Sequence, residues 1–289
     1  MSASRITSRR AVLIGGAATL ASLAAPAPAG DAEGIATLER QHGGTLGVFA
    51  LDLHTHRTLA YRADQRFKLQ STFKGLLAAL VLADVSRGTE RLDAIVKFSK
   101  ADLLPASPVT EAAVERGELT VRELCEAIMY RSDNAAANLL MRRCGGSQRL
   151  TAFVRSLGDK ETRVDHYEGH LEGNPPADDT TTPRAIVHTA RRLLLGATLP
   201  PDARAQLEAW MAGNVVGRSR LRAAFPPEWH AGDRTGTGDG ICNDYAFARR
   251  PAKAPLIVSA YYAAPGADLA DQEAVLRAVG RAVVQWQRR

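Results

Sequence analysis

The pattern of hydrophobic and polar positions predicts strands near both ends of the chain and helices between them. Asp31–Gln41 has the pattern of a first helix. Thr45–Leu53 and Thr58–Arg62 alternate or run apolar on either side of a polar turn at His54–Arg57, as in a β-hairpin. Towards the C-terminus the pattern predicts three more strands and an amphipathic helix: Trp229–Gly236, Tyr245–Arg249, Leu256–Tyr262 and Leu269–Gln287. We therefore expect one sheet assembled from the two ends of the chain.

The middle of the chain is predicted to be helical. Phe73–Val85 is almost entirely apolar, which is typical of a helix buried on most sides. Three further segments carry apolar residues at helical spacing: Thr120–Tyr130, Asn134–Arg143 and Ser147–Leu157. Thr162–Thr182 has little periodicity, which predicts a long loop, and loops of this length are usually functional or disordered. Thr182 and Pro183 then have the pattern of a helix cap and first turn.

The first 29 residues have the three parts of an export signal. Ser8-Arg9-Arg10 is followed by the apolar run Ala11–Ala25 and by Ala27-Pro28-Ala29, a small-x-small cleavage pattern. The paired arginines favour the twin-arginine route, which exports folded proteins. An ordinary signal peptide that happens to contain two arginines is the alternative. The apolar run is short for a bilayer span, so we expect no membrane anchor after processing.

The composition argues against several classes of function. Of 289 residues, 45% are hydrophobic and 24% are charged, as in a soluble globular protein. The net charge is +6, and without the three arginines of the signal it is 34 − 31 = +3, which is too small to indicate nucleic-acid binding. The three cysteines, Cys125, Cys144 and Cys242, fit no zinc site, and His54-Thr55-His56 lacks the further ligands of a metal motif. We expect a monomer with no metal and no cofactor.

Three short motifs follow one another at wide spacing: Ser71-Thr72-Phe73-Lys74, Ser132-Asp133-Asn134 and Arg234-Thr235-Gly236. In a helix, Ser71 and Lys74 share a face, so the amine can take or hold the hydroxyl proton and make a nucleophile. Burial of Lys74 in its apolar segment would lower its pKa and favour a role as base. Ser132 can relay a proton to a leaving nitrogen, and Arg234 and Thr235 can bind a substrate carboxylate. Together the motifs predict one acyl-transfer site.

These motifs resemble those of the class A β-lactamases and their penicillin-binding relatives, although Arg stands in the third where Lys is usual. Other family landmarks lie at suitable spacing from about residue 31 to residue 289: Ser107-Pro108-Val109-Thr110, Asp179–Pro183, Trp210-Met211, Asp233 and Gly240–Asp244. The resemblance implies an α/β plus all-α, two-lobed fold, with an antiparallel sheet formed from both chain ends and a helical lobe inserted. We place the α/β lobe at residues 30–66 and 215–289, and the helical lobe at residues 67–214, with an active-site loop at 162–182.

The resemblance also implies roles for further residues. Glu168 would activate the water that hydrolyses the acyl-enzyme, while either Glu168 or Lys74 could be the base for acylation. Asn134 would bind the side-chain amide of the substrate. Arg220 would help to bind the carboxylate, the alternative being a surface cation in Gly217–Arg222. The backbone amides of Ser71 and Thr237 would form the oxyanion hole.

Three positions depart from the family pattern. Glu172 stands where most members have an Asn that helps to hold the deacylating water. His166 stands where many have an Arg that pairs with an Asp at the far end of the loop, here Asp179. Ala106 stands where many have an aromatic gate residue. These departures bear on the rigidity of the loop, the rate of deacylation and the range of substrates.

The sequence therefore predicts an exported bacterial serine β-lactamase, periplasmic or secreted, that acts on β-lactam antibiotics. Two other functions share the chemistry. A cell-wall D-alanyl-D-alanine peptidase has the same serine and lysine, but Glu168 and the lack of an expected anchor argue against it. A β-lactam sensor that stays acylated normally has a membrane segment or a fused partner, and neither is evident in the sequence.

Overall fold

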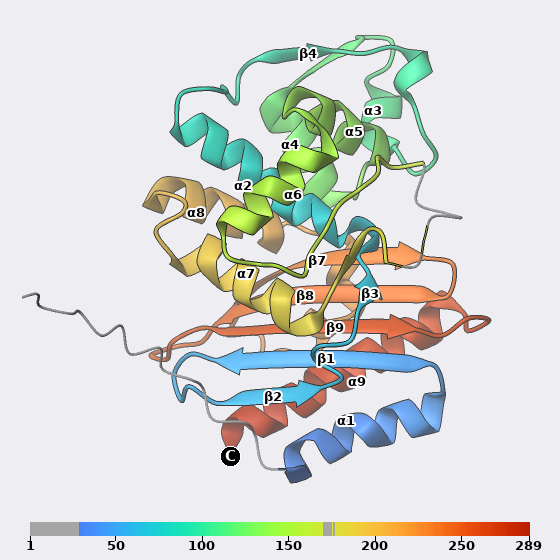
Figure 1. Ribbon diagram of the computed structural model, residues 1–289, viewed down its shortest axis with the longest axis vertical. Helices are drawn as coiled ribbons and strands as arrows, with labels where there is room; N and C mark the ends of the chain where they lie inside the picture. The colour runs from blue at the N-terminus through green and yellow to red at the C-terminus, as the bar shows by residue number, and fades with distance from the viewer. Residues whose placement is uncertain (1–28, 170–174, 176) are drawn as a thin grey trace, which may run out of the picture.

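The computed structural model describes residues 29–169, 175 and 177–289 (Figure 1). The N-terminal part contains α1 (Ala29–His42), β1 (Thr45–Asp52), β2 (Thr58–Tyr61) and β3 (Phe67–Lys68). The middle contains η1 (Gln70–Thr72), α2 (Phe73–Ser86), β4 (Ile95–Lys97), η2 (Lys100–Asp102), α3 (Pro108–Ala112), β5 (Glu118–Thr120), α4 (Val121–Tyr130), α5 (Asn134–Arg143), α6 (Gly146–Ser156), β6 (Thr180–Thr181), α7 (Pro183–Leu195) and α8 (Pro201–Ala212). The C-terminal part contains η3 (Val216–Ser219), η4 (Leu221–Ala224), β7 (His230–Gly238), β8 (Ile241–Arg249), β9 (Leu256–Ala263) and α9 (Leu269–Arg288).

The main sheet joins the two ends of the chain. Its five strands have the order β2-β1-β9-β8-β7, and every neighbouring pair is antiparallel. The join is the pairing of β1 with β9, which runs from Thr45 opposite Ala263 to Asp52 opposite Leu256. A sheet assembled from both chain ends, which the sequence pattern predicted, is therefore confirmed. Strand β7 is left at an edge of the sheet.

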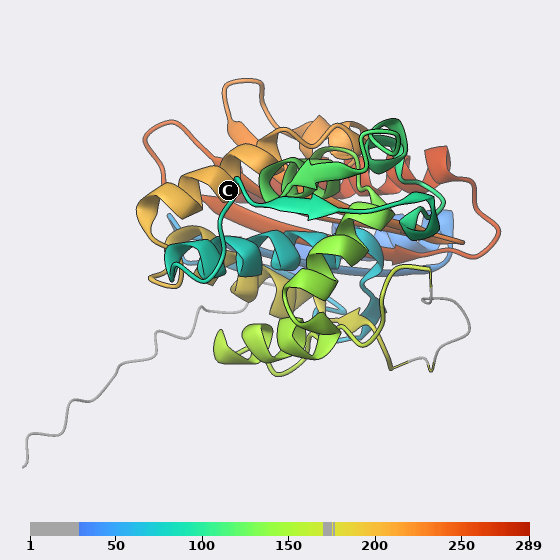
Figure 2. The ribbon, with the colours of Figure 1, turned by 90° about the horizontal axis from the view of Figure 1, so that it is seen from above.

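The two faces of this sheet pack against different groups of helices (Figures 1 and 2). Successive residues of a strand point to opposite faces. Accordingly Phe49 and Tyr261 belong to a core shared with α2, α4, α5, α6 and α7, whereas Val48 and Ala260 belong to a second core shared with α1 and α9. Both sides of the sheet are thus buried, and the helical lobe lies against only one of them. The two-lobed architecture is confirmed.

Helix α2 is the central element of the helical lobe. Its residues from Phe73 to Asp84 are all buried, which agrees with the apolar pattern that predicted a helix covered on most sides. Lys74, the second residue of the helix, is among them and is fully buried. Thr182 caps α7 by accepting a hydrogen bond from the amide of Ala185, with Pro183 in the first turn, as the sequence predicted.

The structure also contains elements that the sequence pattern did not predict. They include α3, α8 and the two-residue or three-residue strands, which pair as β3 with β6 and β4 with β5. The β3–β6 pair matters for function because it joins the segment just before Ser71 to the end of the long loop. No helix in the described part of the chain is both long enough and apolar enough to span a membrane. The expected export signal lies outside the described residues, and the proposed lobe boundaries remain predictions.

Candidate active site

Ser71 lies in η1, the tight turn that leads into α2. Gln70, just before it, has a left-handed backbone with φ of 46°, and α2 begins at Phe73. The Ser71 side chain does not cap the helix, since its Oγ accepts a hydrogen bond from Lys74 Nζ at 2.9 Å and donates one to Glu168 Oε1 at 3.2 Å. The predicted shared face of Ser71 and Lys74 is therefore a direct contact.

Lys74 is at the centre of a polar cluster inside an apolar lobe. Its Nζ lies 2.8 Å from Glu168 Oε1 and donates hydrogen bonds to Asn134 Oδ1 at 2.6 Å and to Ser132 O at 2.8 Å. The pKa of Lys74 is lowered to about 8, chiefly by burial and also by the nearby Arg234, although Glu168 acts in the opposite direction. Lys74 can therefore exchange a proton near neutral pH.

Ser132 lies between Lys74 and Arg234. Its backbone is left-handed, with φ of 59°, and its Oγ is 3.3 Å from Lys74 Nζ and 2.6 Å from Arg234 Nη2. Arg234 is on β7 and is fully buried, and burial lowers its pKa to about 10. The hydroxyl of Ser132 thus links the amine beside the nucleophile to the guanidinium on the edge strand.

Arg220 is not the surface cation that the sequence left open as an alternative. It is fully buried, and its Nη1 donates to the carbonyls of Gly236 and Asn243, each at 2.9 Å. Its Nη2 donates to Thr237 Oγ1 at 2.6 Å, and its Nε pairs with Glu273 at 3.1 Å. The Arg220 guanidinium therefore lies against the C-terminal end of β7, at Gly236 and Thr237.

Glycine at position 236 allows η1 and β7 to lie close together. A Cβ atom there would be 2.7 Å from Leu69 O and 3.2 Å from Ser71 N. Asn243 on β8 holds the same turn, since its side-chain amide donates to the carbonyl of Lys68 at 2.8 Å. Because β7 is an edge strand, its outer backbone groups face this turn rather than another strand. The nucleophile is thus placed against the strand that carries Arg234 and Thr237.

Glu168 comes from the long loop, which is fastened at several points. Asn138 on α5 donates to the carbonyl of Glu168 at 3.0 Å and accepts from its amide at 2.9 Å. At the neck of the loop, Asp179 Oδ2 lies 2.6 Å from His166 Nδ1, and Oδ1 accepts from the amide of Asp165 at 2.8 Å. The His166–Asp179 pair therefore forms even though His replaces the usual Arg.

A cavity of about 600 Å³ opens beside these groups. It is lined by Ser71, Glu168, Asn134 and Thr237, and at its outer end by Lys68, Gln70, Gly238 and Asp239. Asn134 uses its Oδ1 for Lys74 and donates its Nδ2 to Pro105 O at 2.9 Å. Ala106 has a left-handed backbone, with φ of 57°, and offers no aromatic side chain at the rim. This volume is ample for a small organic substrate.

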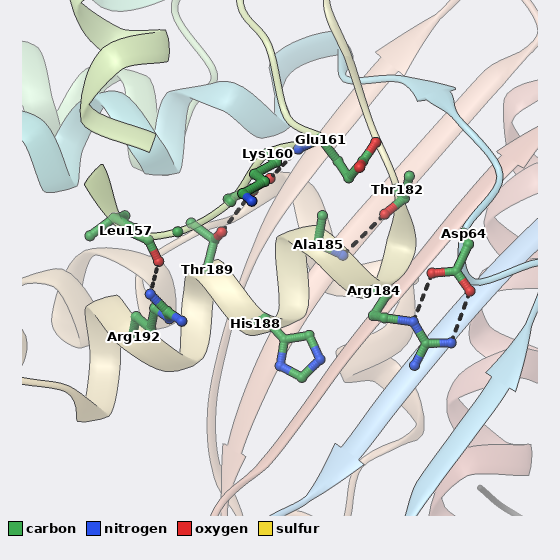
Figure 3. Close-up of a pocket in the computed structure, with 12 residues that line it drawn as sticks. Asp64, Leu157, Lys160, Glu161, Thr182, Arg184, Ala185, His188, Thr189 and Arg192 are labelled. Carbon is green, nitrogen blue, oxygen red and sulfur yellow. Dashed lines mark hydrogen bonds and ion pairs between the residues drawn. The ribbon is translucent and has the colours of Figure 1, made fainter. Parts of the chain in front are cut away.

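A second cavity, of about 330 Å³, lies along α7 and contains none of the predicted site residues. Figure 3 shows Arg184 held by Asp64, and Arg192 directed to the carbonyl of Leu157. Thr189 donates to Asp159, which is buried and fully engaged with its neighbours. These side chains bind one another or neighbouring groups, and none of the predicted site residues lines this cavity, so the candidate site is in the first one.

Most of the predicted site residues therefore meet around one cavity. Ser71, Lys74, Ser132, Asn134, Glu168, Arg220, Arg234 and Thr237 are joined by the contacts above, and Thr235 accepts a hydrogen bond from Arg234 at 3.3 Å. Glu172 lies outside the described residues. His54 and His56 belong to the β1–β2 connection, and no group of residues in the described ranges could hold a metal ion.

Sequence reasoning missed residues whose role depends on tertiary contacts. Asn138 holds Glu168 in place, and Asn243 holds the turn before Ser71. Asp133 caps α5 through the amide of Ala136 and also accepts from the amides of Val109 and Thr110, which ties α3 to α5. Only Asp133 carried a sequence signal, as the middle residue of its motif.

Comparison with known proteins places this geometry in a family. A family model described as "Beta-lactamase enzyme family" matches residues 32–287. The carbapenem-hydrolysing β-lactamase KPC of Klebsiella oxytoca is 42% identical over 258 residues, covering 88% of each chain. A β-lactamase of Mycobacterium tuberculosis is 41% identical over 265 residues, covering 89% of this chain and 85% of the relative.

Solved structures agree with these relatives. The crystal structure of a β-lactamase from Burkholderia vietnamiensis has a TM-score of 0.89 and 50% identity, covering 91% of this chain and 98% of the other. An ancestral class A β-lactamase has a TM-score of 0.85 and 48% identity, covering 89% and 99%. The chain therefore belongs to the class A β-lactamases, serine hydrolases that open β-lactam rings and confer antibiotic resistance.

Proposed function

We propose that this protein is an exported enzyme that hydrolyses penicillin-type and cephalosporin-type antibiotics through an acyl-enzyme on Ser71, with Glu168 as the base for deacylation. The main support for this proposal is the position of Glu168 Oε1, which lies 3.2 Å from Ser71 Oγ and 2.8 Å from Lys74 Nζ. A base in this place can take a proton from a water that attacks an ester on Ser71. It would make the difference between turnover and lasting acylation.

In acylation, Ser71 Oγ forms a bond to the carbonyl carbon of the β-lactam, and its proton passes to Lys74 or to Glu168. The amides of Ser71 and Thr237 would donate to the developing oxyanion, which in other acyl-transfer enzymes contributes about 3–4 kcal/mol per donor. The ring C–N bond then breaks, and the nitrogen takes a proton through the Ser132 hydroxyl. Lys74, at 3.3 Å from that hydroxyl, would resupply the proton.

In deacylation, the oxygen of a water bonds to the ester carbonyl carbon while Glu168 accepts one of its protons. The bond from that carbon to Ser71 Oγ then breaks, and the proton returns to Ser71. Two hydrogen bonds between Asn138 and the backbone of Glu168 support this role, since they hold the carboxylate close to the nucleophile. Glu172 is proposed as a second carboxyl group near the same water.

Substrate recognition would depend on Arg234 of β7 and on Arg220, which lies between η3 and η4. Arg234, Thr235 and Arg220 would bind the substrate carboxylate through charge-assisted hydrogen bonds, and Asn134 would bind the side-chain amide. The Lys74–Asn134 contact of 2.6 Å supports a fixed orientation for that amide group.

The rival functions differ in what happens after acylation. A D-alanyl-D-alanine peptidase or a sensor would be acylated by a β-lactam and would release the acyl group very slowly. Class A β-lactamases are generally exported, and the signal pattern of residues 1–29 supports export here, by the twin-arginine route or the general one. We further propose a monomer, periplasmic or secreted, that needs no cofactor.

The test is repeated turnover of nitrocefin, a chromogenic cephalosporin, by the purified mature protein. We expect many equivalents of product per equivalent of enzyme. A single equivalent, followed by a stable adduct, would overturn the proposal in favour of a sensor or a peptidase.

A further inference from the structure

Two buried carboxyl groups, on the edge strand and on its neighbour, have no part in the proposed chemistry. Asp233 is on β7 and Asp244 is on β8, and both are 0% exposed. In the antiparallel register Asp244 lies opposite Thr235, so Asp233 is its diagonal neighbour on the same face of the sheet. The two carboxyl groups lie close enough for the charge of Asp233 to act on Asp244.

Each carboxyl group has one oxygen in a hydrogen bond and one without. Asp233 Oδ1 accepts from Asn214 Nδ2 at 2.7 Å, and Asp244 Oδ2 accepts from the amide of Leu221 at 3.2 Å. Among the described residues, no donor makes a hydrogen bond to Asp233 Oδ2 or to Asp244 Oδ1. Arg222 Nε forms only an ion pair with Asp233 Oδ2, at 3.2 Å. Buried acceptors left in this state are costly, and a proton on one carboxyl group removes its charge and turns one of its acceptors into a donor.

The surroundings make double ionisation unfavourable. Burial raises the pKa of Asp233, and burial together with the charge of Asp233 raises the pKa of Asp244 well above its ordinary value. Two like charges in one buried site cannot both ionise cheaply. The other titratable groups around the two carboxyl groups belong to the neighbouring strands, to the segment 220–222 and to α9. They are Arg220, Arg222, Arg234, Cys242, Tyr245, Tyr261 and, through its ion pair with Arg220, Glu273.

We propose that Asp233 and Asp244 share one proton, held on Asp244, and that neutral Asp244 positions Arg220 for the substrate carboxylate. Asp244 Oδ2 holds the amide of Leu221, the residue that directly follows Arg220. The carbonyl of Asn243, directly before Asp244, accepts from Arg220 Nη1 at 2.9 Å. Asp244 is thus a positioning residue for Arg220. Its side chain holds the backbone next to Arg220, and the residue before it accepts from the Arg220 guanidinium.

The shared proton also sets the local charge. Three guanidinium groups are gathered here: Arg220, Arg222 and Arg234. With Asp244 neutral they face two ionised carboxylates, Asp233 and Glu273, and one positive charge remains for the substrate. If Asp244 were ionised as well, the charges would cancel. This inference rests on the proposed carboxylate-binding role of Arg220.

The first test compares the pH dependence of stability in the parent protein and in Asp244→Asn, which removes the titrating group but keeps a donor. An unfolded aspartate releases its proton near pH ~3.9. Above that pH the folded parent would hold one proton that the unfolded chain lacks, so its stability falls as pH rises. Above about pH 5, and up to the raised pKa of folded Asp244, the unfolding equilibrium constant of the parent should rise about tenfold per pH unit relative to the variant.

Asp52→Asn is the matched control. Asp52 is also buried, and although burial alone would raise its pKa, the hydrogen bonds from Arg250 lower it overall. This carboxylate is ionised in both states above about pH 5, so the ratio of parent to control should not change with pH. If the ratio of parent to Asp244→Asn were equally constant, Asp244 would be ionised in the folded protein and the proposal would be overturned.

The second test starts from the parent protein and uses Asp244→Asn only to assign the band. Infrared spectroscopy of the parent, with a carbon-13 label at the aspartate carboxyl groups, should show the C=O band of a neutral carboxylic acid above pH ~5, where an ordinary aspartate is ionised. Absence of that band, or its persistence in Asp244→Asn, would overturn the assignment of the proton to Asp244. Neither test uses turnover, so failure of this inference is distinguishable from failure of the proposed function, which nitrocefin turnover reports.

Discussion

Replacing Glu168 by Gln tests the proposed deacylation step most directly. The glutamine keeps an oxygen where Glu168 Oε1 now lies, 3.2 Å from Ser71 Oγ, but it cannot accept a proton from water. Loss of a general base costs about 10²–10⁴-fold in rate, which corresponds to about 2.7–5.4 kcal/mol of barrier. Acylation and deacylation should therefore separate, with the second step slowed by that factor.

The size of this effect predicts what accumulates. If acylation is at least as fast as deacylation in the parent, a hundredfold slower second step leaves about 99% of the variant as acyl-enzyme during turnover. Stopped-flow mixing with nitrocefin should give a burst of one product per enzyme, and mass spectrometry should locate the adduct on Ser71. Steady-state turnover at the parental rate would refute the assignment of Glu168 as the base.

The same variant addresses the base for acylation. Burial holds the pKa of Lys74 at about 8, and Glu168 raises it against that trend. Removing the carboxylate charge should lower the pKa of Lys74 further, so that the neutral amine is available at lower pH. If Lys74 is the acylation base, the acidic limb of the acylation rate moves to lower pH in Glu168→Gln. If acylation instead falls as much as deacylation, Glu168 is the base for both steps.

The remaining predictions concern the nucleophile, the carboxylate site and the loop. Ser71→Ala should abolish turnover without changing thermal stability, and an adduct on any other residue of the parent would contradict the assignment. Arg234→Ala should weaken transition-state binding of penicillins by about 1.5–3 kcal/mol, with a smaller loss for carboxylate esters, and equal losses would argue against a carboxylate role. Glu172→Asn should keep activity and move the acidic limb of the kcat profile to lower pH, because the carboxyl group proposed to lie near the water is removed; an unchanged profile would contradict that proposed place for Glu172. His166→Ala should lower Tm and kcat together, because the 2.6 Å contact with Asp179 at the neck of the loop is lost, and an unaltered Tm would show that the backbone contacts suffice.

The sequence by itself determined the family and the main architecture. Hydrophobic periodicity is a local property, so the long strands and helices could be predicted from it, and the apolar run after Ser71 indicated a helix buried on most sides. The three motifs carried enough chemistry to predict a nucleophile, a base and a carboxylate site. Short elements such as β3 and β6 had no such signal, because two residues cannot show a period.

Only the tertiary structure decided how the polar groups partner one another. No sequence pattern indicates that Asn138 holds Glu168 or that Arg220 is buried against β7. Nor does any pattern indicate that Asp233 and Asp244 each keep an oxygen with no donor in the described part of the chain. These contacts join positions distant in the chain, and they form because a buried polar group must find a partner once water is excluded. The identity of the residues is written in the sequence, but the pKa of Lys74 and the charge of the carboxylate site arise from burial and from neighbours that the fold brings together.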